Sequence, residues 1–180
     1  SQADLDSVGF DWINNYWCNL LNEEGMNGMN NPARPFAIFA MIILCLSLLQ
    51  FFFLFANGFE KPGIWRTIIK VSGTLSMVAA ALISTDYHDL MTTLSSIFGI
   101  LVVVGIIRAV YASEMTVFKW SGFICIFLLL VNNYIYYTHV FLDFLPLIQK
   151  ATFALVLLWI AGLNVKLIGK NPVNSEQTKS

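Results

Sequence analysis

The residues in this sequence best suited to chemistry are its two histidines and the carboxylates beside them. His88 lies between Asp86 and Asp89, and His139 is followed four residues later by Asp143. Imidazole nitrogen and carboxylate oxygen are ligands that zinc and other divalent metals accept in proteins. One hypothesis is therefore a divalent metal site made of Asp86, His88, Asp89, His139 and Asp143.

Three other interpretations of the same residues stay open. Because histidine titrates near neutral pH, the pair could act as a general acid and base. Two facing imidazoles could instead hold haem. The simplest interpretation is that these groups cap helix ends and are hydrated at the level of lipid headgroups. The spacing matches no His-Glu-x-x-His signature, so no catalytic residue can be named.

Several other kinds of site are not indicated by the sequence. It contains no phosphate-binding glycine loop, no Gly-x-Ser-x-Gly elbow and no Cys-x-x-Cys pair, which argues against a conventional soluble enzyme. The three cysteines, Cys18, Cys45 and Cys125, have no paired spacing, so neither a disulfide framework nor a zinc module is predicted. The net charge of −1 provides no basic surface, and nucleic acid is not an expected partner.

The elements that must position these residues are transmembrane helices. The chain has 180 residues, of which 57% are hydrophobic and 12% charged, with a mean hydropathy of +0.70. A soluble domain is about half apolar and a quarter charged, so the composition predicts an integral membrane protein in contact with the lipid bilayer. Five apolar runs of about 20 residues are each long enough to cross ~30 Å of hydrocarbon. They cover residues 36–57, 64–84, 92–112, 117–140 and 146–169.

The predicted fold is all-α, a polytopic transmembrane helix bundle in residues 36–169. Residues 1–35 form a polar leader before it, and residues 170–180 form a disordered tail after it. Within the leader, apolar residues recur at steps of three and four between Phe10 and Leu21, which predicts an amphipathic helix. That helix would lie in the membrane interface or cover the end of the bundle as a lid.

The distribution of positive charge predicts the orientation. One side of the membrane receives every Lys and Arg except Arg34 and Lys150, and cytoplasmic loops are the ones rich in these residues. The C-terminus is then cytoplasmic and residues 1–35 are extracytoplasmic, in a bacterial inner membrane or a plasma membrane. An extracytoplasmic leader must be translocated, so we expect an upstream helix or signal and six spans in the full-length protein.

The leader and a later turn carry a resemblance to a known family. The leader segments Phe10-Asp11-Trp12-Ile13-Asn14-Asn15 and Asn31-Pro32-Ala33-Arg34-Pro35 precede a long apolar helix, and the Asp86-Tyr87-His88 turn joins two later helices. This layout resembles the domain-of-unknown-function 998 family, within the broader Frag/DRAM/Sfk-like group of six-helix membrane proteins. The resemblance implies a six-helix fold and a membrane location, and it implies no established reaction.

These observations lead to two hypotheses about function. The first is a non-enzymatic accessory, interaction or sensory component of the membrane, whose partner is another membrane protein or a second copy of the chain. The second is an outward-facing metal-dependent hydrolase, or a haem- or metal-binding membrane protein, that uses the His88 and His139 cluster with the leader helix as a lid. No ionisable residue lies near mid-membrane in the predicted spans, which argues against ion-coupled transport.

Overall fold

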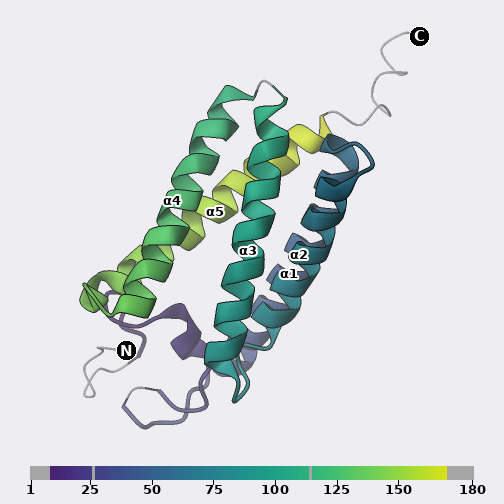
Figure 1. Ribbon diagram of the computed structural model, residues 1–180. Coiled ribbons are helices and arrows are strands. Elements are labelled where there is room, and N and C mark those ends of the chain that lie inside the picture. The colour runs from purple at the N-terminus through teal and green to yellow at the C-terminus, as the bar shows by residue number, and fades with distance from the viewer. Residues whose placement is uncertain (1–8, 26, 114, 170–180) are drawn as a thin grey trace.

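The computed structural model describes residues 9–25, 27–113 and 115–169, and the regular elements of these residues are helices (Figure 1). The predicted disordered tail lies outside the described residues. The helices confirm the all-α fold class, and their boundaries fall within a few residues of the five predicted apolar runs. They are α1 (Arg34–Phe59), α2 (Ile64–Ala81), α3 (His88–Tyr111), α4 (Thr116–Thr138) and α5 (Leu145–Ile168), with two 3₁₀ helices, η1 (Trp17–Leu21) and η2 (Leu142–Phe144).

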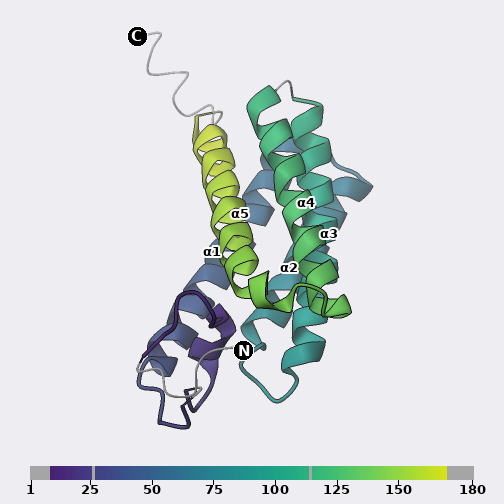
Figure 2. The same ribbon diagram turned by 90° about the vertical axis from the view of Figure 1, so that its left-hand side faces the viewer.

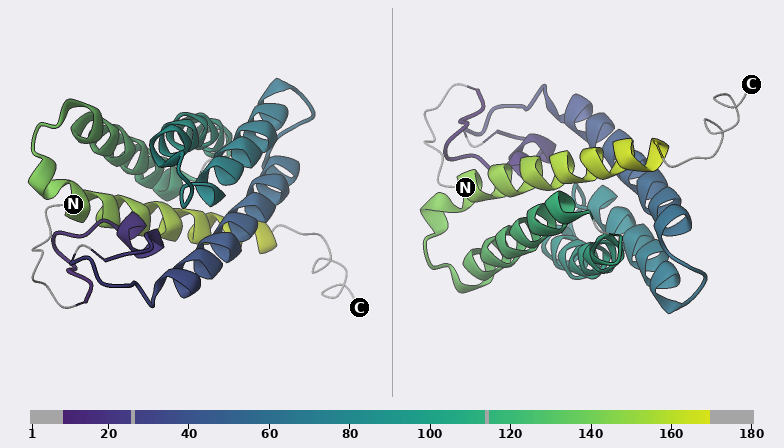
Figure 3. Two further views of the ribbon diagram at one scale, coloured as in Figure 1. Left: turned by 90° about the horizontal axis from the view of Figure 1, so that it is seen from below. Right: turned by 90° about the horizontal axis from the view of Figure 1, so that it is seen from above.

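The helices form a bundle in which each packs against the next along the chain, and α5 returns to contact α1 (Figures 1 and 2). Short connections make successive helices antiparallel, so the turns gather at two ends. We call the leader end the one formed by residues 9–25, 27–33, 82–87 and 139–144. The opposite end holds residues 60–63, the described residues between α3 and α4 (112, 113 and 115) and the end of α5. The two views along the bundle in Figure 3 show the leader lying against α1 and α5.

The core is built from bulky side chains that lie against glycines on the neighbouring helix. A Cβ added to Gly73 of α2 would lie 2.5 Å from Phe52 of α1. Between α4 and α5 the arrangement is reciprocal, because Trp159 lies over Gly122 and Phe118 lies over Gly162, each 2.8 Å from such a Cβ. Small residues at helix contacts are the usual means of close packing in membranes, where burial of apolar surface does not drive association.

Most of the apolar surface of this bundle faces outward. Among the described residues, four helical segments are long and apolar enough to cross a membrane: Arg34–Phe59, His88–Tyr111, Thr116–Thr138 and Leu142–Ile168. Only 11% of the apolar window of α4 is buried inside the protein, so this helix needs a non-aqueous environment. These features suggest an integral membrane protein.

The fifth predicted span is not among those four segments. The helix α2 has 18 residues, about 27 Å at 1.5 Å per residue, and it carries Arg66 and Lys70 near its start. Its small residues Ser72, Gly73 and Ser76 are buried against its neighbours. A helix covered on both sides by α1 and α3 can be less apolar than one facing lipid, and a fifth span stays a prediction.

The predicted leader helix over residues 10–21 is not formed, and only the five-residue η1 is present. The Asp11 carboxylate accepts hydrogen bonds from the backbone N–H groups of Ile13 and Asn14 and from the Asn14 side chain, at 2.8–3.1 Å. Such local side-chain bonds offer the backbone an alternative to the helix. The apolar periodicity was therefore outweighed by a turn that the sequence also encodes.

Candidate functional site

The turn between α2 and α3 sets the position of His88 and Asp89. Its geometry is fixed by Thr85, whose hydroxyl donates to the Leu82 carbonyl at 2.7 Å and accepts from the Tyr87 N–H at 3.4 Å. The helix α3 begins immediately afterwards, so His88 and Asp89 occupy its first turn rather than a loop. A carboxylate is favourable there because it interacts with the positive end of the helix dipole.

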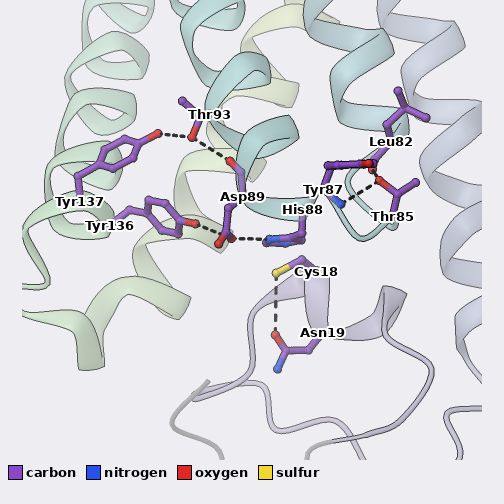
Figure 4. Close-up of polar contacts among 10 residues, drawn as sticks. All are labelled: Cys18, Asn19, Leu82, Thr85, Tyr87, His88, Asp89, Thr93, Tyr136 and Tyr137. Atoms are coloured by element: carbon purple, nitrogen blue, oxygen red, sulfur yellow. Dashed lines mark hydrogen bonds and ion pairs between the residues drawn. The ribbon is translucent and has the colours of Figure 1, made fainter.

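Asp89 connects the start of α3 to the end of α4 (Figure 4). Its Oδ1 atom interacts with His88 Nδ1 at 3.1 Å and accepts a hydrogen bond from the Tyr136 hydroxyl at 3.3 Å. The Asp89 side chain is nevertheless 90% exposed, so it remains accessible to a ligand from outside the protein.

A second hydrogen-bonded link runs beside the first. The Tyr137 hydroxyl donates to Thr93 Oγ1 at 2.9 Å, and the Thr93 hydroxyl donates to the Asp89 carbonyl at 2.8 Å. The rings of Tyr136 and Tyr137 meet edge to face, 5.1 Å apart. Two consecutive tyrosines of α4 thus fasten onto one turn of α3 (Figure 4).

His139 ends α4 in a left-handed conformation, with φ of 59°. Phe141 also has a positive φ, of 60°. Positive φ is uncommon for a side chain other than glycine, and among these histidine tolerates it better than a bulky aromatic residue. The two residues reverse the chain between α4 and η2, and this reversal brings His139 to the same groove as Asp89.

The groove at the leader end has a volume of about 380 Å³. Three helical segments and the leader contribute to its walls, and three of its seven lining side chains are tyrosines. The seven are Tyr16, Asp89, Thr93, Tyr136, Tyr137, His139 and Leu142.

Tyr16 reaches the groove because the leader is anchored to α5. Lys150 donates to the Asn15 carbonyl at 2.5 Å and to the Pro146 carbonyl at 3.2 Å, and Trp17 lies edge to face against Phe153 at 4.8 Å. Burial raises the pKa of the Tyr16 hydroxyl, and the nearby Cys18 and Asp143 side chains act in the same direction. Tyr16 is therefore a neutral phenol at physiological pH.

Cys18 lies below His88 in the close-up (Figure 4). Burial is the main reason that the pKa of its thiol is raised. A neutral thiol is a weak nucleophile and a weak metal ligand, so Cys18 adds no reactive group to this end of the molecule.

The structure assembles only part of the predicted metal site. His88 contacts Asp89, and His139 lines the groove with Asp89, whereas Asp86 and Asp143 are not among the lining residues. Within the part of the chain that the structure describes, no three His, Cys, Asp or Glu side chains lie close enough to hold a metal ion. The five-residue metal site, and haem between two imidazoles, stay predictions that this geometry does not support.

The groove's tyrosines and Thr93 were not predicted as site residues. The run Tyr134, Tyr136, Tyr137 is visible in the sequence, but it matches the usual enrichment of tyrosine at membrane interfaces. Tyr16 is 120 positions away from Tyr136 and only the folded chain brings it near.

Comparisons with known proteins do not add a function to this geometry. No family model, curated protein or solved structure matches the chain. The resemblance to the domain-of-unknown-function 998 family is therefore carried by the sequence layout alone.

Proposed function

We propose that this protein is a non-enzymatic accessory, interaction or sensory component of a membrane, and that it acts by binding at the leader-end groove. The observation that carries the proposal is that polar side chains of the groove are hydrogen-bonded to one another. Tyr136 is bonded to Asp89 and Tyr137 to Thr93, so these hydroxyls hold α3 and α4 together. Such groups shape a binding surface, whereas catalysis needs an aligned nucleophile and base.

The proposed orientation places the leader end outside the cytoplasm. The opposite end carries Lys61, Arg66, Arg108 and Lys119, in agreement with the enrichment of positive charge in cytoplasmic loops. The groove then lies at the outer surface, with α2 as a fifth span. Its partner is a membrane protein, a second copy of the chain or a component of the bilayer.

Elemental analysis of detergent-purified protein tests the non-enzymatic proposal. Wild-type protein is compared with a His88→Ala/His139→Ala double variant and with a Glu24→Ala variant as a surface control. We expect background zinc, manganese and iron in all three, together with no Soret absorbance band. Near-stoichiometric metal or haem that disappears only in the double variant would contradict the proposal and favour a metal-dependent enzyme.

A further inference from the structure

The leader-end groove combines aromatic rings with one accessible carboxylate. Tyr16, Tyr136, Tyr137 and His139 line the groove together with Asp89. Both described contacts of the Asp89 carboxylate are made through Oδ1, and the side chain is 90% exposed. The Oδ2 edge of the carboxylate is thus available to a further partner.

The charges around the groove are predominantly negative. Asp143 lies close enough to Tyr16 to raise the pKa of its hydroxyl. Of the basic residues of this end, Arg34 pairs with Glu23 at 2.9 Å, and the charged Lys150 is held by the Asn15 and Pro146 carbonyls rather than by Asp89. Apart from the neighbouring His88, the described ion pairs include no cationic partner for Asp89. An anionic ligand would be repelled here and a cation attracted.

Aromatic rings together with a carboxylate are the chemistry that recognises a substituted ammonium group. The faces of tyrosine rings attract such cations through their quadrupole, and quaternary ammonium ligands are bound in aromatic cages of this kind. A volume of about 380 Å³ lies at the small end of the range for ligand pockets, roughly 300–1,000 Å³. It suits a headgroup but not a whole lipid.

An exposed apolar track leads away from the groove along α4. Its members recur at steps of three and four, so they share one face of the helix. They are Tyr137, Tyr134, Leu130 and Phe127, each at least 51% exposed. A headgroup held at Asp89 would leave its acyl chains beside this track.

We propose that the leader-end groove binds the ammonium group of a zwitterionic phospholipid, phosphatidylcholine or phosphatidylethanolamine, through Asp89 and the rings of Tyr16, Tyr136 and Tyr137. This inference rests on the proposed function, because it names the ligand of the same groove. One class of bilayer lipid is then a specific ligand of the protein, in addition to the bilayer being its surrounding solvent.

Native mass spectrometry of the purified protein with short-chain phosphatidylcholine and phosphatidylglycerol of equal chain length tests the inference. We expect phosphatidylcholine to bind about threefold to tenfold more tightly, because a cation–π contact and an ion pair at an exposed site each contribute about 1 kcal/mol or less. Asp89→Asn keeps the shape and the acceptor for Tyr136 but removes the charge, and should abolish the preference. Asp86→Asn removes an acid from the adjacent turn outside the groove and should retain it.

A second pair of variants tests the role of the rings. Tyr137→Leu should reduce binding of phosphatidylcholine about threefold to tenfold, whereas Tyr137→Phe keeps the ring and should retain most of the affinity. Equal binding of the two lipids by wild type, or equal effects of Asp89→Asn and Asp86→Asn, would overturn the inference. If free choline bound as tightly as phosphatidylcholine, the ligand would be a soluble ammonium compound and the claim that it is a lipid would be contradicted.

The two proposals fail separately. If the wild-type protein shows no lipid selectivity, the lipid inference fails, but the metal analysis of the His88→Ala/His139→Ala variant still tests the non-enzymatic proposal. That analysis involves neither lipid nor Asp89. A metal-containing protein with lipid selectivity would contradict the non-enzymatic proposal alone.

Discussion

The two ends of the bundle use charged side chains in opposite ways. At the opposite end, Glu60, which directly follows α1, is paired with Arg108 of α3 at 2.7 Å, and the Glu60 side chain is only 11% exposed. The Arg108 guanidinium also lies over the Trp65 ring of α2, 5.0 Å from its centroid. At the leader end, the Asp89 side chain is 90% exposed and its partners are an imidazole and a hydroxyl.

This difference indicates that the opposite end is a structural clamp and the leader end an open surface. The Glu60–Arg108 pair and Trp65 join α1, α2 and α3 through groups that are partly withdrawn from water, where charge pairs are stronger. The leader end instead places its carboxylate in solvent, where an ion pair contributes little to stability. Four predictions would break or sharpen this contrast.

The largest expected effect is that of Arg108→Ala. This change leaves the Glu60 carboxylate partly buried without its cation, and we expect the free energy of unfolding to fall by about 2 kcal/mol. The loss is smaller than that for a fully buried ion pair because the Arg108 side chain is half exposed. Thermal unfolding in detergent, followed by circular dichroism, measures it. Arg66→Ala is the matched control, because the described hydrogen bonds of Arg66 are with the neutral Asn57 at the same end. Asp89→Asn should cost less than about 0.5 kcal/mol. Equal losses for Arg108→Ala and Asp89→Asn would remove the distinction between the ends.

The hydrogen bonds of the leader end should contribute less. Tyr137→Phe removes the 2.9 Å bond to Thr93, and about 1 kcal/mol is a typical net loss for one hydrogen bond. Tyr136→Phe removes a longer bond of 3.3 Å and should cost less. In a double-mutant cycle, Thr93→Ala should cost less when Tyr137 is already Phe than in the wild type, and the remaining loss is that of the Thr93 bond to the Asp89 carbonyl. Additive losses would mean that the two hydroxyls do not form the link seen in the structure.

The elements of this fold were largely predictable from the sequence, whereas the groove was not. As predicted, Pro35 and Pro146 lie in the first turns of α1 and α5. Proline is favoured there because the backbone N–H that it lacks would have no partner within the helix. The links from Tyr136 and Tyr137 span 47 and 44 residues, and no local pattern encodes them. The predicted helix in the leader was wrong because the spacing of its apolar residues does not reveal the hydrogen bonds that Asp11 makes to the backbone.

A backbone effect at the leader end should be detectable at His139. Its left-handed conformation costs about 1 kcal/mol for a residue with a Cβ and almost nothing for glycine. His139→Gly should therefore be about 1 kcal/mol more stable than His139→Ala in the same unfolding experiment. Since both variants lack the imidazole, their difference reports the backbone alone. A less stable glycine variant would show that the turn is not strained.

The smallest expected effect is a pH dependence of the leader. Hydrogen bonds from Asn14, and then from the Ile13 N–H, lower the pKa of Asp11 below its ordinary value. A depressed pKa means that the ionised group stabilises the turn at higher pH and that this contribution is lost as the pH falls through the folded pKa. Tryptophan fluorescence from Trp12 and Trp17 should thus change only below about pH 4. Asp11→Asn should not show that change, and a transition shared by both proteins would have another origin.

The contrast between the ends depends most directly on which one faces out of the cell. One cysteine at a time is introduced, as Asp86→Cys at the leader end or Lys61→Cys at the opposite end, in a chain with Cys18→Ser whose remaining Cys45 and Cys125 are buried. Intact cells are then treated with a membrane-impermeant maleimide. The account predicts labelling at position 86 before lysis and at position 61 only after it. Labelling at position 61 in intact cells, with position 86 protected until lysis, would place the groove in the cytoplasm and contradict the account.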